Sequence, residues 1–219
     1  MRKPWVSKRL GDLASVRAGD PAPQRSEEFA ETGVPFVRMQ DVGRYGRTTA
    51  LLETRDRLSL EAASKLKRFP AGSILVPKSG ASIRLNHRAI LGMDACVVSH
   101  LAVIKTAPEL HNRFAYYWLC SVDLSQVAHD ADLPSLKISE LERLAIPLPP
   151  LAEQERIVRI LDAAEELRRL REQTDRRTAD LVPALFHDMF GDPATNPRGN
   201  RSDAPREPYL FNPMAPPAG

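Results

Sequence analysis

The stretch IPLPPLAEQERIVRILDAAEELRRLREQTDRRTADLVPALFHDMFGD, from Ile146 to Asp192, decides how the rest of the chain must be organised. Prolines end one segment, and a helical pattern then runs from Ala152 to Phe190, with Gly191 placed as its C-cap. An unbroken helix of that length extends for roughly 58 Å at 1.5 Å per residue. A globular domain of about 150 residues is smaller than that, so the segment predicts a helix that projects.

Apolar residues recur along this helix at heptad spacing. The first seam is Ile157, Ala164, Arg171, Thr178 and Leu185, and the second is Ile160, Leu167, Thr174 and Leu181. An a/d pattern predicts a coiled coil, and the chain offers no second helix of this length. The helix must therefore pair with a copy of itself or pack on a different protein. The expected dimerisation contacts are Ile157, Ile160, Leu161, Ala164, Leu167, Thr174, Leu181 and Leu185.

Two features of the helix pattern leave alternatives open. The middle of the seam is polar, at Arg171, Thr174 and Thr178. Either these residues favour one register over slipped alternatives, as polar core positions do in coiled coils, or they are simply exposed to solvent. Pro183 is expected to kink or end the first long segment.

The chain divides into three parts by composition. Its 219 residues, of which 42% are hydrophobic, suffice for one core and an appendage. Residues 1–150 change hydrophobic period every few residues, which predicts a mixed α/β (α+β) globular domain. Residues 151–191 form the long helix. Residues 192–219 are rich in Pro, Asn, Gly and charge, which predicts a disordered tail.

Segments within residues 1–150 predict individual elements. Runs rich in β-branched residues predict strands at residues 34–39, 72–78 and 95–105. Ser59 suits the N-cap of a short helix. Residues 139–147 predict a short helix followed by a strand that stops at a proline. Residues 108–122 predict a helix whose aromatic stripe belongs to the core: Phe114, Tyr117 and Trp118.

The sequence contains no recognisable catalytic motif. A glycine-rich phosphate loop, GxSxG, HExxH and CxxC are all missing, and the five histidines follow no metal-ligand spacing. We therefore expect no catalytic residue, metal site or cofactor. The stretch AHDAD, residues 128–132, could form a metal or acid/base cluster, although a polar loop is the favoured interpretation. Cys96 and Cys120 lie in apolar segments and predict reduced thiols.

The expected location is the cytoplasm. No hydrophobic run approaches the roughly 20 residues needed to span a bilayer. The beginning of the chain, MRKPWVSKRL, is basic but lacks the apolar region of a secretion signal.

Positive charge is concentrated in one region. The formal net charge is only +3, yet the segment from Arg38 to Arg88 holds eleven basic residues against four acidic ones, an excess of seven. Regional basicity of this kind is typical of a polyanion-binding surface. A solvated basic face without a ligand is the alternative.

The basic region contains two loops whose side chains suit DNA. They are VRMQDVGRYGR, residues 37–47, and PKSGASIRLNHRA, residues 77–89. The expected phosphate contacts are Arg47, Lys78 and Ser79. The expected base contacts are Arg38, Gln40, Arg84, Asn86 and Arg88. The DNA-binding set is completed by Arg44, His87 and, in the loop LPSLK at residues 133–137, Ser135 and Lys137.

Several segments together resemble the specificity subunit of type I restriction–modification enzymes. They are WVSKRLGDLASVRAG (5–19), GVPFVRMQDV (33–42), AGSILVPKSGASI (71–83), VVSHLAVIK (97–105) and LKISELERLAIPLPPLAEQERIVRIL (136–161). The most specific match is the junction into the long helix, formed by Ile146, Pro147, Leu148, Pro149, Pro150, Glu153, Gln154 and Ile157.

The resemblance implies a double-stranded DNA-reading subunit that has no catalytic site of its own. The usual chain of that family holds two recognition domains and two long antiparallel helices, whereas this chain has one of each. Two copies paired as an antiparallel coiled coil would then restore two half-sites at a fixed spacing. The resemblance also implies docking of adenine methyltransferase subunits, which would bind S-adenosylmethionine, and of restriction and translocase subunits.

Three other functions remain open from the sequence. One is a scaffold protein whose helix binds a partner helix and whose basic face is incidental. Another is a small nuclease or modifying enzyme that uses HDAD, residues 129–132. A solitary recognition module of a different defence or regulatory complex is the third.

Overall fold

The computed structural model describes residues 5–44, 50–128 and 134–191. These residues fall into two compact units, Met1–Glu166 and Leu167–Gly219, which are described separately. The elements, with the two 3-10 helices written η, are in chain order β1 (Val6–Arg9), α1 (Leu10–Leu13), β2 (Ala14–Ala18), η1 (Ser26–Glu28), β3 (Phe29–Val37), α2 (Met39–Arg44), β4 (Ala50–Leu51), β5 (Asp56–Leu58), α3 (Leu60–Ser64), β6 (Arg68–Phe69), β7 (Ile74–Pro77), β8 (Ala89–Leu91), β9 (Ala95–Val97), β10 (Leu101–Thr106), α4 (Asn112–Ser121), η2 (Leu124–Gln126), α5 (Ile138–Arg143), β11 (Ala145–Leu148) and α6 (Leu151–Phe190).

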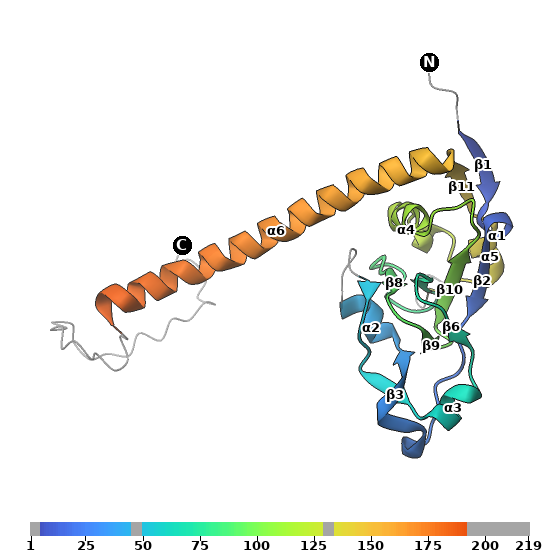
Figure 1. Cartoon of the computed structure of the whole chain (residues 1–219), viewed down its shortest axis with the longest axis horizontal. Helices are drawn as coiled ribbons and strands as arrows, with labels where there is room; N and C mark the ends of the chain where they lie inside the picture. Colours follow the sequence, from blue (N-terminus) through green and yellow to red (C-terminus); the bar gives the residue numbers. More distant parts are fainter. Residues whose placement is uncertain (1–4, 45–49, 129–133, 192–219) are drawn as a thin grey trace, which may run out of the picture. The chain divides into compact units, whose positions relative to one another are not determined.

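The strands of the described residues form three sheets (Figure 1). Their orders are β1-β11, β2-β10-β7-β8-β4 and β5-β3-β9-β6. Most neighbouring strands are antiparallel, while the β3–β9 and β4–β8 pairs are parallel. Short helices lie between the strands, so the predicted mixed α/β fold is confirmed.

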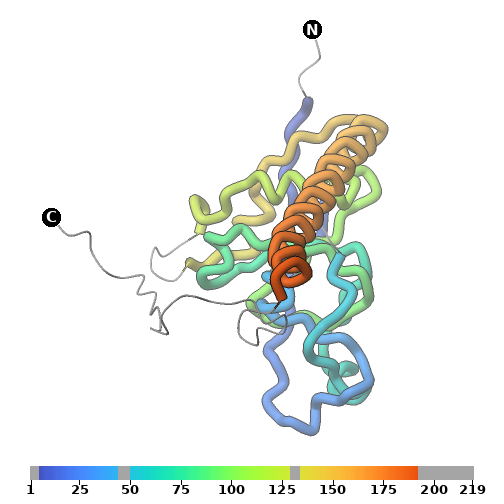
Figure 2. The backbone as a smooth tube through the Cα atoms, turned by 90° about the vertical axis from the view of Figure 1, so that its left-hand side faces the viewer, coloured from blue at the N-terminus to red at the C-terminus, as the bar shows by residue number. Residues whose placement is uncertain are grey.

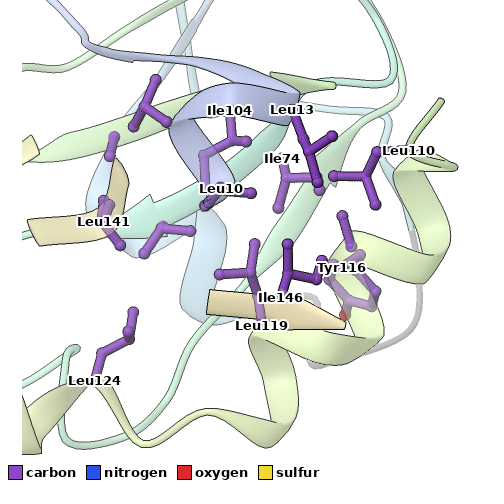
Figure 3. Close-up of a cluster of buried hydrophobic side chains, with 14 of the residues drawn as sticks. Leu10, Leu13, Ile74, Ile104, Leu110, Tyr116, Leu119, Leu124, Leu141 and Ile146 are labelled. Carbon is purple, nitrogen blue, oxygen red and sulfur yellow. The ribbon is translucent and has the colours of Figure 1, made fainter. Parts of the chain in front are cut away.

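The five-stranded sheet lies between two hydrophobic cores. Because side chains alternate between the two faces of a strand, Ile74 and Ile104 enter one core while Leu75 and Val103 enter the other. Figure 3 shows the first core, in which Leu10, Leu13, Ile74 and Ile104 meet side chains of α4, α5 and β11. The aromatic stripe of α4 contributes to this core as predicted. Phe114 is buried in the core, and the partly buried Tyr117 and Trp118 pack against the core.

The four-stranded sheet carries the second core and corrects one predicted strand. Residues 95–105, expected to be extended throughout, are divided into β9 and β10, with Val98–His100 as the turn between them. β9 pairs with β3, whereas β10 pairs with β2 and β7, so this turn connects two sheets. Both cysteines are free thiols, Cys96 buried and Cys120 half-buried.

The region around Met39 also differs from the expectation. The predicted strand at residues 34–39 is the end of β3, which stops at Val37. The residues expected to form a loop after it begin the helix α2. The carboxylate of Asp41 accepts the backbone N–H of Arg38 at 2.8 Å, which satisfies a donor at the start of this helix. Ser59 caps α3 as predicted, because its hydroxyl accepts the N–H of Ala62 at 3.2 Å.

The beginning and end of the globular part pair with each other. β1 and β11 form an antiparallel ladder in which Val6 is opposite Leu148 and Arg9 is opposite Ala145 (Figures 1 and 2). The helix and strand predicted for residues 139–147 are α5 and β11. β11 continues through Pro147 to Leu148, so the proline-rich junction Pro147–Pro150 begins within the strand that joins both ends of the domain.

α6 extends over 40 residues, as one continuous helix in Figures 1 and 2. Its length is about 60 Å at 1.5 Å per residue. Gly191 ends it with φ 78° and an N–H bonded to the carbonyl of His187 at 2.9 Å, which confirms the predicted C-cap. Pro183 lies inside the helix, so the expected end of a first segment at this residue is wrong.

The first turns of α6 pack on the globular part, which extends the compact unit beyond residue 150 to Glu166. Val158 is buried in the first core, and Ile157 packs against it. Ile157 therefore packs on its own domain while remaining partly exposed, and its place in the dimerisation seam stays a prediction. Ile160, Leu167, Leu181 and Leu185 are each about half exposed or more.

Some expectations lie outside the described residues. They are the disordered tail at residues 192–219 and the HDAD cluster at residues 129–132. Of the helices in the described parts of the chain, none combines the length and apolar composition that a membrane crossing requires.

Candidate nucleic-acid interface

The interface begins where β7 ends at Pro77. The N–H of Lys78 donates to the carbonyl of His100 at 3.0 Å, and the carbonyl of Lys78 accepts the N–H of Leu136 at 2.8 Å. The Ser79 hydroxyl lies 2.9 Å from Nδ1 of His100. Three segments that are far apart in sequence are therefore bonded together at this point.

The segment LPSLK meets the loop after β7 as a short antiparallel bridge. Ser135 pairs with Ser79, and the N–H of Gly80 donates to the carbonyl of Pro134 at 2.8 Å. Pro134 and Leu136 are buried, whereas Ser135 and Lys137 are exposed. This alternation holds the segment in the domain and directs its two polar residues outward. Leu133 lies outside the described residues.

Residues 80–87 form a compact turn that is closed by its own backbone. Gly80, with φ 74°, allows the chain to reverse after the bridge. Its carbonyl accepts the N–H of Ile83, and the carbonyl of Ala81 accepts the N–H of Leu85, both at 3.1 Å. Ile83 is fully buried in the first core and fixes the turn to the domain.

The turn ends at Asn86, which has the left-handed backbone with φ 53°. Asparagine tolerates this conformation better than most residues. Its side-chain amide donates to the carbonyl of Cys120, at the end of α4, at 2.7 Å. Asn86 thus holds the turn against α4, a role that its place among the predicted base contacts did not indicate.

Helix α2 packs beside the same turn. A Cβ added to Gly43 would lie 3.1 Å from Cε1 of His87, so the glycine allows the helix to approach the imidazole closely. Gln40, one turn earlier in α2, is exposed. The structure therefore brings the two basic segments of the sequence together.

Two predicted base contacts already have partners inside the domain. The Arg38 guanidinium forms an ion pair with Asp56, and its Cζ lies 5.5 and 5.4 Å from the ring centroids of Phe29 and Phe36. The Arg88 side chain is 1% exposed and donates to the carbonyl of His87. In this conformation the Arg88 guanidinium is inside the domain, so it offers no donor to a base edge.

The remaining predicted residues differ in accessibility. Gln40, Arg84, Ser135 and Lys137 are exposed, while Lys78, Ser79, Asn86 and His87 are half-buried. The side chain of Arg44 and all of Arg47 lie outside the described residues. His100 is exposed beside Lys78 and Ser79 but was not among the predicted contacts, because its proximity depends on pairing between distant segments.

The chemistry of this surface is that of polar recognition. Lys78, Arg84 and Lys137 supply positive charge, and Gln40 and Ser135 supply donors and acceptors. No group of three His, Cys, Asp or Glu side chains in the described parts of the chain is arranged to hold a metal ion. Cations and amides suit phosphates and base edges, the two parts of DNA that proteins contact.

The chain matches known proteins over most of its length. The family model described as "Type I restriction modification DNA specificity domain" matches residues 2–176. The "Type I restriction enzyme MjaIX specificity subunit" of Methanocaldococcus jannaschii is 32% identical over 153 residues, which cover 68% of this chain and 34% of that one. The chain thus spans about a third of the length of this relative.

Solved structures share the fold at lower sequence identity. A chain from a structure of complex assembly and conformational transition in a type I R-M system has a TM-score of 0.66 and 21% identity, and the match covers 84% of this chain and 44% of that one. The HsdS subunit of Thermoanaerobacter tengcongensis has a TM-score of 0.58 and 22% identity, with coverage of 76% and 39%.

Proposed function

Because the chain belongs to the family of type I restriction modification DNA specificity domains, we propose that its globular unit recognises one half of a bipartite duplex DNA target. In this proposal the chain carries out no catalysis. It determines which sequence is acted upon, and separate subunits act on it.

The observation that supports this most directly is the meeting of three polar segments. The loop after β7, the segment at residues 134–137 and helix α2 lie together through the Ser79–Ser135 bridge and the approach of Gly43 to His87. Short segments held by a rigid sheet are a common way to present binding side chains. Each of the three segments carries at least one exposed polar or charged residue.

Different side chains of this surface suit different parts of DNA. Lys78 and Ser79 are both bonded to His100, the residue before β10. We assign them to phosphates, where position matters more than sequence. Gln40 and Arg84 are exposed and match the adenine and guanine edges of the major groove. Ser135 and Lys137 extend the surface, whereas Asn86 positions the turn through Cys120.

Two copies of the chain would supply two half-sites. The exposed apolar residues of α6 recur at heptad spacing after Ile157. Ile157 itself packs against the first core of its own domain. A helix of about 60 Å is longer than one DNA turn of roughly 34–36 Å, so paired helices could separate two recognition units by more than a turn. The expected product is an antiparallel homodimer that reads a gapped palindrome.

One antiparallel register fits the helix better than its neighbours. Placing Ile160 opposite Leu185 of the second copy also places Ala164 opposite Leu181, so both ends of the seam are apolar. At the flanks, Leu161 then meets Val182 and Arg168 meets Asp175. A shift of one heptad in either direction sets Arg168 against Arg168 or Asp175 against Asp175. Like charges oppose those registers.

The catalytic partners in this proposal are adenine methyltransferase subunits. They would dock on the paired helices and bind S-adenosylmethionine themselves, and restriction subunits would join through them. The Methanocaldococcus jannaschii relative is named as the specificity subunit of a type I restriction enzyme, which supports such an assembly.

Mapping adenine methylation at base resolution tests the proposal. Cells that carry this chain together with the methyltransferase encoded beside it are compared with cells that lack the chain. A gapped palindrome that depends on the chain is the expected result. A gapped motif with unlike halves would replace the homodimer by a pair of different specificity chains. The absence of any motif, with a methyltransferase shown to be competent, would overturn the proposal in favour of a scaffold.

A further inference from the structure

The turn after β7 presents a leucine to solvent next to an arginine. Leu85 is 61% exposed although it follows Ile83, which is fully buried, by only two residues. Arg84 lies between them and is also exposed. Single exposed leucines are common on protein surfaces, so the exposure of Leu85 acquires meaning only from how it is held.

Anchors on both sides fix the position of Leu85. On one side, Ile83 is packed in the first core and its N–H is bonded to Gly80. On the other, Asn86 has a left-handed backbone and donates to the carbonyl of Cys120 at 2.7 Å. The N–H of Leu85 itself donates to the carbonyl of Ala81 at 3.1 Å. The backbone of such a short, closed turn loses little conformational freedom on binding.

The surroundings of Leu85 favour DNA over a protein partner. Its sequence neighbours Arg84, Asn86 and His87 are polar or charged, whereas a protein-docking site needs a contiguous apolar patch. Within the described residues, the Arg84 side chain makes no hydrogen bond or ion pair, so its charge is available to a ligand. The apolar group that DNA offers to proteins in the major groove is the thymine 5-methyl group.

We propose that Leu85 is a specificity-determining residue that contacts the 5-methyl group of one thymine in the major groove, beside a base or phosphate held by Arg84. The proposal rests on the proposed function, because it requires that this loop meets DNA. It adds an apolar contact to a surface whose predicted contacts were all polar.

Replacing thymine by deoxyuridine tests the contact, because it removes only the methyl group. Duplexes carrying the methylated motif are made with each thymine replaced in turn, and their affinities for the full chain with its methyltransferase are measured. One position should weaken binding about fourfold, the factor expected for one buried methyl-sized group. Leu85→Ala should bind the thymine and deoxyuridine duplexes equally at that position.

Two variants serve as matched controls. Leu60→Ala shortens another exposed leucine, on α3, and should keep the thymine preference. Arg84→Ala should weaken binding but also keep that preference. Thermal unfolding of Leu85→Ala should match the wild type, because the side chain is exposed.

The outcomes separate this inference from the proposed function. A motif that is recognised with no thymine–deoxyuridine difference at any position overturns the role of Leu85 and leaves the proposed function intact. The same holds if Leu85→Ala retains the difference. If Leu85→Ala weakens assembly with the methyltransferase but not DNA binding, a protein contact replaces the DNA contact. Loss of all motif-specific binding in the wild type would instead contradict the proposed function.

Discussion

The side-chain carbonyl of Gln154 accepts the backbone N–H of His111 at 2.8 Å, which bonds the first turn of α6 to the residue before α4. The amide of the same side chain donates to the carbonyls of Glu109 at 3.0 Å and Pro149 at 2.9 Å. Gln154 is completely buried. The glutamine of the proline-rich junction therefore joins the residue after β11, the first turn of α6 and the segment before α4.

Gln154→Ala should destabilise the globular unit by about 2–4 kcal/mol, because it removes three hydrogen bonds and leaves buried backbone groups without partners. Urea unfolding at a single protein concentration measures the change. Gln173→Ala is the matched control, because Gln173 is exposed on the same helix, and its effect should stay within about 0.5 kcal/mol. Equal effects of the two substitutions would contradict the structural role of Gln154.

Tyr116 should make stability depend on alkaline pH. Its burial, together with the nearby Cys120, raises the pKa of the phenol far above its ordinary value. The unfolded chain loses this proton near pH 10, whereas the folded chain retains it. The contribution of Tyr116 to the free energy of unfolding is therefore fully present below about pH 10. Above that pH it falls by about 1.4 kcal/mol per pH unit.

Tyr116→Phe isolates this contribution. Unfolding free energies of the wild type and the variant, measured between pH 8 and about 11, should differ less as the pH rises. The variant has no phenol to titrate at this position, so its curve should be the flatter one. Parallel curves above pH 10 would show that Tyr116 ionises equally in both states.

Arg84 and Lys137 should differ in what they contribute to DNA binding. Arg84→Ala should cost about 1–3 kcal/mol and relax one base position of the motif, whereas Lys137→Ala should weaken binding to all sequences and reduce the salt slope by about one. Binding to motif and scrambled duplexes over a range of salt concentrations distinguishes the two. Equal losses on every sequence for Arg84→Ala would reassign that side chain to phosphate.

The proposed register of α6 predicts a specific cross-link. A chain with Ala164→Cys and Leu181→Cys should form covalent dimers with a short bismaleimide, because these positions face each other in the antiparallel pair. The matched control combines Glu165→Cys with Leu181→Cys, since Glu165 lies outside the seam. Efficient cross-linking of the control, or none in either variant, would contradict the register. The wild type reports any background from Cys96 and Cys120.

Much of the fold was predictable because it depends on local pattern. The length of α6, the Ser59 cap, the Gly191 C-cap and the strand at residues 145–148 each follow from residues within a few positions of one another. The errors arise where a turn or a tertiary contact interrupts the local pattern. The turn at Val98–His100 interrupts a run of β-branched residues, and α2 depends on Asp41, whose carboxylate also accepts the N–H of Arg55.

The sequence by itself determined the class of the fold, the length and end of α6, the basic region and the family resemblance, because spacing, capping residues and charge are properties of neighbouring positions. Only the tertiary structure decided which polar residues share a surface. Ser79 meets Ser135, 56 positions later in the sequence, through an antiparallel bridge. Arg88 is buried inside the domain, whereas the nearby Arg84 is exposed. Likewise, only the tertiary structure shows that Ile157, at the start of the heptad seam, packs on its own domain. Burial and long-range pairing depend on the whole chain, so local pattern cannot determine them.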